Sequence, residues 1–187
     1  MERLRESPDP FRERSDADRW RTCVHEAGHA IIATAFGVRV LTISADPEGS
    51  TWGRCVPLGR LGDARTIEDA RAGIVVALAG SVAEEIECGE HLREGALTDN
   101  AEALSLARKL VGLLADIADA EVEIKAGKET ARALLRSQWP NVQRLAFSLE
   151  APQRVVEELD LAGLLDPELR SICHTLAEIR SGLPLAE

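Results

Sequence analysis

The chain has 187 residues, which suits one ordinary domain and falls short of two, and its 45% apolar and 3% aromatic content predicts an aliphatic core that favours helices over sheets. Its 22 Lys and Arg residues against 32 Asp and Glu residues give a net charge of −10, and because no run of basic residues occurs, we expect no nucleic-acid partner. No stretch has signal-peptide character or reaches the roughly 20 apolar residues that a membrane span needs, so the expected location is the cytoplasm.

The first folded element expected along the chain is a long helix. Residues 1–14 are densely charged, and we expect a flexible lead segment there. From Ser15 the apolar residues recur at helical spacing as far as Gly37, a residue well suited to ending a helix. This helix carries the sequence His-Glu-Ala-Gly-His at residues 25–29.

Two short strands are predicted after this helix. Residues 38–44 are rich in β-branched side chains, and residues 51–58 form a second short run beyond a turn signal. Pro57 marks the second run as an edge strand, because a proline cannot donate a hydrogen bond to a central ladder.

Four further helices are predicted from apolar residues that recur on one face. They run from Thr66 to Gly89, from Thr98 to about residue 115, over residues 117–149 with a kink near Pro140, and onward from Asp166. Thr66 and Thr98 are expected to cap the first two of these helices.

The expected fold class is therefore mainly α, within the α+β group. We expect a single helical domain over residues 15–180, with a two- to three-stranded β element beside the first helix, and a flexible tail at residues 181–187. The four cysteines show no CxxC spacing, so we expect reduced thiols in place of a disulfide framework or a thiolate zinc site.

The strongest functional signal is the pair His25 and His29 with Glu26 between them. Two histidines four positions apart on a helix lie on the same face, so both imidazoles can reach one Zn²⁺, with the glutamate beside an open fourth position. Gly28 inside the helix costs about 1 kcal/mol relative to alanine, which indicates that another element approaches the backbone there.

Three motifs in this order resemble the peptidase domain of the FtsH-type ATP-dependent zinc metalloproteases. They are HEAGHA at residues 25–30, LAGSVAEE at residues 78–85, and ALTDNAEALSLARKLV at residues 96–111. The resemblance implies a helical metallopeptidase fold in which His25, His29 and Asp99 bind zinc and Glu26 is the general base.

The third ligand has rivals among the acidic residues. Asp99 falls in the first turn of a predicted helix, where the helix dipole favours its charged form. Glu84 and Glu85 lie on the preceding long helix; we rank Glu85 below Asp99, either as an alternative ligand or as the acceptor of a ligating histidine's N–H. His91 and His174 lie outside any ligand pattern.

The implied activity is endopeptidase cleavage of unfolded or flexible polypeptide. Zn²⁺ would lower the pKa of a water to about 7 and polarise the scissile carbonyl, Glu26 would take the proton, and an extended peptide would align on the edge strand near residues 52–56. No phosphate-binding G-x-x-x-x-G-K-[ST] motif occurs, so we expect no ATP-driven unfolding by this chain.

Two partner classes and two rival functions stay open beside that interpretation. A separate ATPase and a homo-oligomeric assembly are the candidate protein partners that the resemblance suggests. The alternative function is a zinc-bound module that binds or regulates another protein without hydrolysis, and a third interpretation is a helical protein without metal.

Overall fold

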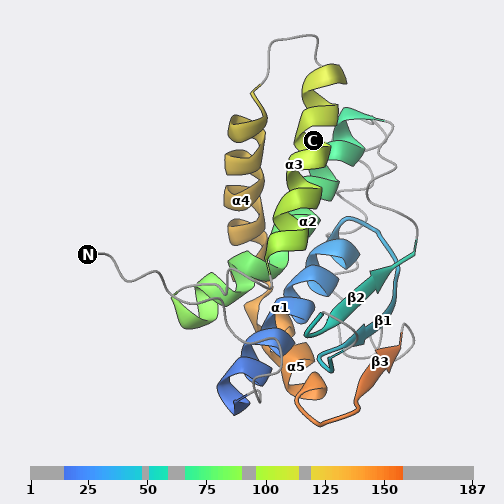
Figure 1. The fold of residues 1–187 in the computed structure, drawn as a ribbon, viewed down its shortest axis with the longest axis vertical. Coiled ribbons are helices and arrows are strands. Elements are labelled where there is room, and N and C mark those ends of the chain that lie inside the picture. Colours follow the sequence, from blue (N-terminus) through green and yellow to red (C-terminus); the bar gives the residue numbers. More distant parts are fainter. Residues whose placement is uncertain (1–14, 48–50, 59–65, 90–95, 114–118, 158–187) are drawn as a thin grey trace, which may run out of the picture.

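The computed structural model describes residues 15–47, 51–58, 66–89, 96–113 and 119–157 (Figure 1). Its elements in chain order are α1 Asp16–Ala35, β1 Val40–Ser44, β2 Arg54–Pro57, α2 Ile67–Cys88, α3 Leu97–Leu113, α4 Ala120–Ser137, α5 Trp139–Leu149 and β3 Val155–Glu157. The prediction of a mainly helical fold with a small β element is confirmed. The expected lead segment, the last helix and the tail lie outside the described residues.

The helix α1 lies between the small sheet and the other helices. It packs against α2 and α5, while β1 and β2 cover another of its sides (Figure 1). The helices α2, α3 and α4 contact one another in the part of the molecule away from the sheet. No helix among the described residues combines the length and the apolar character needed to cross a membrane.

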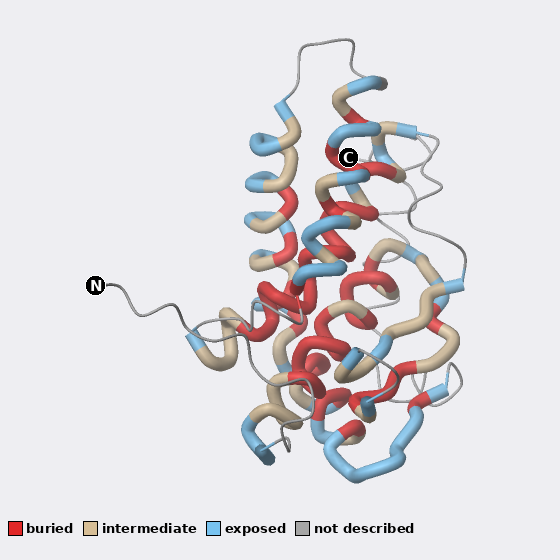
Figure 2. The backbone as a smooth tube through the Cα atoms, in the orientation of Figure 1, coloured by how far each residue is buried: buried red, intermediate tan, exposed pale blue. Residues whose placement is uncertain are grey.

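Two apolar clusters form the core, and α2 contributes to both. The larger one joins α1, α2, α4, α5 and the sheet through side chains such as Ile31, Ile43 and Leu145. The smaller one joins α2, α3 and α4 through side chains such as Leu78 and Leu110. Because α2 is covered on several sides, it is buried along most of its length (Figure 2).

Local capping signals fix the ends of α1 and α2. The Ser15 hydroxyl accepts a hydrogen bond from the Asp18 N–H, and the Asp18 carboxylate accepts one from the Ser15 N–H, which forms a capping box. Thr66 caps α2 through its hydroxyl oxygen, which accepts from the Asp69 N–H at 3.0 Å. At the other end of α2, Gly89 takes the left-handed conformation with φ of 78°, as expected of a helix stop.

Two predicted helix boundaries are wrong. The Asn100 N–H donates to the Ala96 carbonyl, so α3 begins before Thr98, and Thr98 lies inside the helix instead of capping it. The predicted kinked helix around Pro140 is two separate helices, because α4 ends at Ser137 and α5 begins at Trp139. Proline lacks an N–H to donate, which suits the first turn of a new helix.

The sheet has the order β2-β1-β3 and is antiparallel throughout. The prediction that β2 is an edge strand is confirmed within the described sheet. β3 was not predicted as a strand; Val156, its buried residue, pairs with Ile43 on β1. Three residues with one buried side chain are too short to show strand periodicity in the sequence.

Arg19 links three elements at the first turns of α1. Its Nε donates to the Glu150 carbonyl at 2.7 Å, and its Nη2 donates to the carbonyls of Leu149 at 3.1 Å and Ala151 at 3.0 Å. Its Nη1 pairs with Asp46 Oδ1 at 2.8 Å. Arg19 therefore satisfies carbonyls at the C-terminal end of α5 and ties them to the segment that follows β1.

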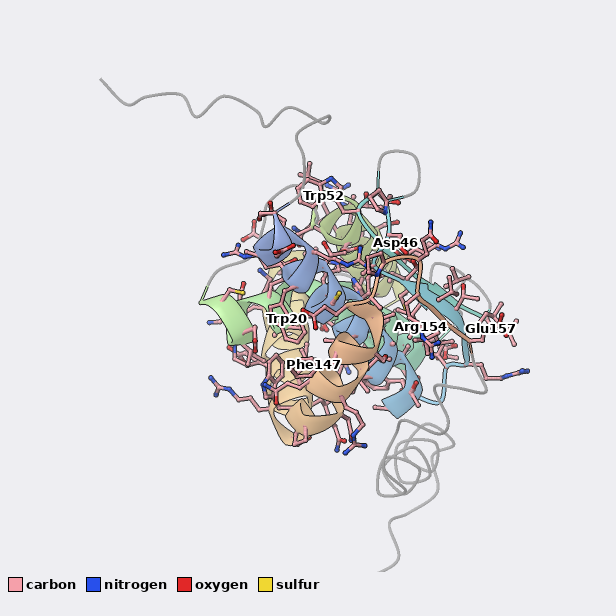
Figure 3. The ribbon with its side chains drawn as sticks, turned by 90° about the horizontal axis from the view of Figure 1, so that it is seen from below. Trp20, Asp46, Trp52, Phe147, Arg154 and Glu157 are labelled. Atoms are coloured by element: carbon pink, nitrogen blue, oxygen red, sulfur yellow. The ribbon has the colours of Figure 1, made fainter. Side chains whose placement is uncertain are left out.

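Trp20, the next residue, joins α1 to α5 and α2. Its ring lies against that of Phe147 on α5 with the centroids 4.9 Å apart (Figure 3). Its Nε1–H donates to Glu87 Oε1 on α2 at 3.0 Å. The beginning of α1 is thus held on two sides by side-chain contacts.

Gly28 is a point of close approach between α1 and α2. A Cβ atom at this position would lie 2.7 Å from Ala83 Cβ and 2.9 Å from the Ala79 carbonyl oxygen, closer than real Cβ contacts allow. The expectation that another element approaches the backbone at Gly28 is confirmed. The histidine-bearing part of α1 is therefore held directly against the α2 backbone.

Candidate metal centre

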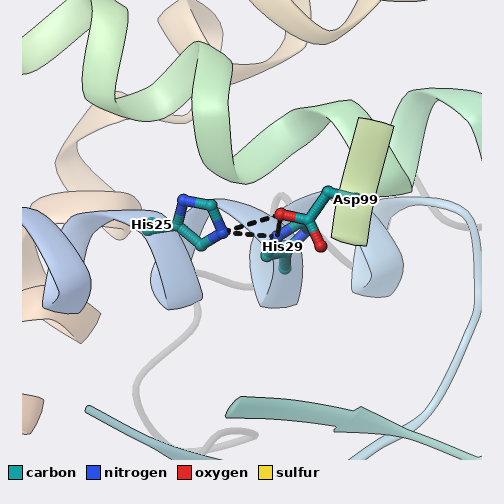
Figure 4. Close-up of side chains that lie close together, drawn as sticks. All are labelled: His25, His29 and Asp99. Atoms are coloured by element: carbon teal, nitrogen blue, oxygen red, sulfur yellow. Dashed lines mark hydrogen bonds and ion pairs between the residues drawn. The ribbon is translucent and has the colours of Figure 1, made fainter. Parts of the chain in front are cut away.

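Three potential ligand atoms converge where α1 meets the first turn of α3. His25 Nε2 lies 3.0 Å from Asp99 Oδ2 and 3.0 Å from His29 Nε2, and His29 Nε2 lies 3.3 Å from Asp99 Oδ2 (Figure 4). The histidines come from successive turns of one face of α1. The structure thus brings together the three residues that the sequence singled out as candidate metal ligands.

Each imidazole is held from behind by α2. His25 Nδ1 lies 2.7 Å from Glu84 Oε1, and His29 Nδ1 lies 2.8 Å from the Val76 carbonyl oxygen. Because a carbonyl can only accept a hydrogen bond, the His29 proton sits on Nδ1, and Nε2 is left with its lone pair toward the centre when the ring is neutral. Hydrogen bonds of this kind orient metal-binding histidines in proteins.

The contact expected from Glu85 is made by its neighbour Glu84. Glu84 is buried, with 3% of its surface exposed, and faces α1. Glu85 points to the other side of α2, where it pairs with Arg132 of α4. Consecutive residues on a helix are about 100° apart, so only one of the two glutamates can face the histidines.

Gly80 forms the floor of the centre. A Cβ atom there would lie 2.5 Å from the Nε2 atoms of both His25 and His29. The α2 backbone therefore occupies the position directly behind the two nitrogens, and any side chain larger than hydrogen would displace them. Two imidazole nitrogens and one carboxylate oxygen within 4.8 Å of one another are a donor set that suits Zn²⁺.

The charges of the centre depend on these contacts. Burial lowers the pKa of His25, but hydrogen bonds to Asp99 and Glu84 outweigh it and raise the pKa to about 10. For Asp99, burial raises the pKa, but the hydrogen bonds from His25 and His29 bring it well below the usual range. Without metal, the centre therefore holds a buried imidazolium beside carboxylates at neutral pH.

Glu26 lies on α1 next to His25, and 7% of its surface is exposed. Burial raises the pKa of this carboxyl group, while the nearby His25 and His29 pull in the opposite direction. A carboxylate with a raised pKa accepts a proton from water more readily, which is the property that a general base near neutral pH requires.

Zinc binding is expected to release about one proton per protein at pH 7–9, because the raised pKa leaves His25 protonated and a ligating imidazole must lose that proton. Apparent zinc affinity should therefore rise about tenfold per pH unit and level off as the pH approaches the His25 pKa of about 10. Calorimetric titration in buffers of different ionisation enthalpy measures the proton count.

The raised pKa of His25 also makes the stability of the metal-free protein depend on pH. A raised folded-state pKa stabilises the fold fully below the ordinary value of 6.5, and this contribution is lost as the pH rises toward about 10. Zinc binding without net proton release, or with an affinity independent of pH, would contradict the prediction that His25 is protonated in the metal-free protein.

Comparison with known proteins places these residues in a family context. Residues 12–114 match the model of peptidase family M41. The chain is 32% identical to the ATP-dependent zinc metalloprotease FtsH 3 of Conexibacter woesei and 31% identical to the ATP-dependent zinc metalloprotease FtsH 1 of Symbiobacterium thermophilum. The two alignments cover 90% and 89% of this chain but only 22% and 32% of those proteins. The chain thus spans less than a third of the length of these relatives.

Proposed function

Because the chain belongs to peptidase family M41, we propose that it is a zinc-dependent endopeptidase that cleaves unfolded or flexible polypeptide. The observation that carries the proposal is the convergence of His25, His29 and Asp99, with both imidazoles oriented from α2. Glu26, one position after the first histidine, supplies the buried carboxylate that hydrolysis requires.

Each residue has a separate role in this proposal. Two histidines and Asp99 hold the ion, which when bound polarises the scissile carbonyl and acidifies a water molecule. Glu84 and the Val76 carbonyl fix the ring orientations through the Nδ1 atoms. The Glu26 carboxylate takes a proton from the attacking water and passes it to the leaving amine.

The edge strand β2 supplies the proposed substrate platform. It stands at the end of the sheet order, and Gly53, the residue before it, contacts Glu26. An extended peptide that adds to this edge as a further strand would run past the general base. Recognition through backbone hydrogen bonds favours segments that are already unfolded and demands little sequence specificity.

The setting proposed for this activity is the cytoplasm. The cysteines in the described part of the chain form no disulfide with one another, as is usual in a reducing compartment. We propose that a separate ATPase unfolds folded substrates for this site, because the relatives that the chain matches are ATP-dependent zinc metalloproteases. We also propose that the chain acts as a homo-oligomer.

Zinc-loaded protein is expected to cleave casein slowly and to stop when a chelator removes the metal. A destabilised variant of a reporter domain should be cleaved, whereas its native form should be spared, because opening a stable domain costs about 5–15 kcal/mol. ATP should have no effect on the purified chain. If casein stays intact after incubation with fully zinc-loaded protein, the proposal is wrong and a non-hydrolytic zinc-binding module is favoured. Equal cleavage of both reporter forms would contradict the proposed preference for unfolded or flexible polypeptide.

A further inference from the structure

We infer that Gly53 is a positioning residue for Glu26. Because glycine has no side chain, it leaves the Glu26 carboxylate in the position that catalysis requires. The inference rests on the proposed endopeptidase function. It assigns a role in catalysis to Gly53, a residue just before β2 that neither binds the metal nor carries a proton.

The evidence is the space around Gly53. A Cβ atom at this position would lie 2.7 Å from Glu26 Oε1, 2.9 Å from Glu26 Cγ and 2.7 Å from Thr22 Cγ2. All three distances are shorter than real Cβ contacts allow, so two residues on one face of α1 close over the Gly53 backbone. The Glu26 side chain occupies the position where any other amino acid would place its Cβ.

Backbone conformation does not account for glycine here. Among the described glycines, only Gly37 and Gly89 have positive φ values, so an L-residue can adopt the Gly53 backbone without strain. Space against α1 is therefore the reason for a glycine at position 53.

The two neighbours differ in how easily they can move. Thr22 is β-branched and buried, and its hydroxyl donates to the Asp18 carbonyl at 3.0 Å, so its methyl group is held in place. Glu26 has three side-chain torsions, and rotation about them moves its carboxylate without moving the backbone. Displacement of the Glu26 carboxylate is therefore the side-chain movement that makes room for a methyl group at position 53, whereas the contact with Thr22 Cγ2 requires a slight shift of the Gly53 backbone.

The candidate metal ligands are not among the nearest neighbours of a Cβ atom at position 53. The close contacts of a Cβ at position 53 involve Glu26 and Thr22, whereas those of a Cβ at Gly80 involve the Nε2 atoms of His25 and His29. The two glycines therefore separate two properties of one centre: Gly80 leaves room for metal binding, and Gly53 leaves room for the base.

The test is the variant Gly53→Ala, compared with wild type for zinc content, thermal unfolding, kcat and KM on a flexible fluorogenic peptide. We expect full zinc content, a near-unchanged unfolding temperature and KM, and a fall in kcat of about 10- to 100-fold, the cost typical of a group misplaced by about 1 Å. Gly112→Ala on α3 is the matched control, because a Cβ there meets no atom within 4 Å, and it should keep wild-type kcat.

Two double variants identify the route of the effect. If Gly53 acts through Glu26, then Gly53→Ala should cause no further loss of kcat in a Glu26→Gln background. Thr22→Ser removes the colliding methyl group but keeps the hydroxyl, and it should not restore the activity of Gly53→Ala. Restoration by Thr22→Ser would show that the effect runs through a shift of β2 and would overturn the inference.

A crystal structure of Gly53→Ala provides a readout independent of activity. We expect the Glu26 carboxylate to be displaced while the imidazoles of His25 and His29 keep their positions. An unmoved Glu26, a kcat within twofold of wild type, or loss of zinc or fold in parallel with kcat would each refute the inference. Failure of the proposed function has a different signature, namely wild-type protein and Glu26→Gln with the same turnover.

Discussion

Glu26→Gln is expected to slow peptide hydrolysis severely while the protein keeps its zinc and its fold. Glutamine fills nearly the same volume as glutamate, but its amide oxygen cannot take up and return the proton of the attacking water. General-base catalysis contributes about 10²- to 10⁴-fold to the rates of such reactions, so kcat should fall by that factor. The measurement is steady-state cleavage of a flexible peptide, with zinc determined on the same preparation.

Glu85→Gln is the matched control for this variant. Glu85 has the same chemistry and lies on the neighbouring helix, but it pairs with Arg132 on the side of α2 away from the centre. Its substitution should leave kcat within about twofold of wild type, as is usual away from the chemistry. Turnover by Glu26→Gln at the wild-type rate would remove Glu26 from the mechanism.

Asp99→Ala is expected to strip the centre of its metal. The substitution leaves two histidines and no anionic ligand, and a two-ligand site holds Zn²⁺ far more weakly than a three-ligand site. It also removes the acceptor that lies 3.0 Å from His25 Nε2 and 3.3 Å from His29 Nε2. The zinc dissociation constant should rise by at least about 100-fold, as measured by competition with a fluorescent chelator.

Two glutamate variants serve as comparisons for the zinc affinity of Asp99→Ala. Glu84→Gln keeps a hydrogen-bond acceptor near His25 but removes the charge, so zinc affinity should fall by about 10- to 100-fold. Glu85→Ala should bind zinc as the wild type does. Full zinc occupancy in Asp99→Ala together with loss in Glu85→Ala would assign the third ligand to α2 instead of α3.

The parts of the fold that were predicted correctly depend on local chemistry. Thr66 caps a helix with its own side chain, and Gly89 ends one with a conformation that glycine adopts readily, so each signal lies within a few residues of its effect. The spacing of His25 and His29 is likewise local, since one helical turn determines that both face the same direction.

The errors concern contacts that no local pattern records. The rank order of Glu84 and Glu85 depends on which side of α2 meets α1, and α2 is apolar on several sides, so its own periodicity gives little direction. At Pro140 the sequence predicts a kinked helix, whereas the structure has two helices that meet at Gln138, a buried residue whose side-chain oxygen accepts a hydrogen bond from Asn141.

The candidate ligands are unequally spaced along the chain: the histidines are 4 positions apart, whereas His25 and Asp99 are 74 apart. A nascent or unfolded chain presents the histidine pair early, but bringing Asp99 to it requires closing a long loop at an entropic cost. The three-ligand set is complete only once α3 has docked on α2, and binding energy then adds to folding energy. A bound ion would act as a cross-link between α1 and α3, so that undocking of α3 and release of the ion become a single cooperative event.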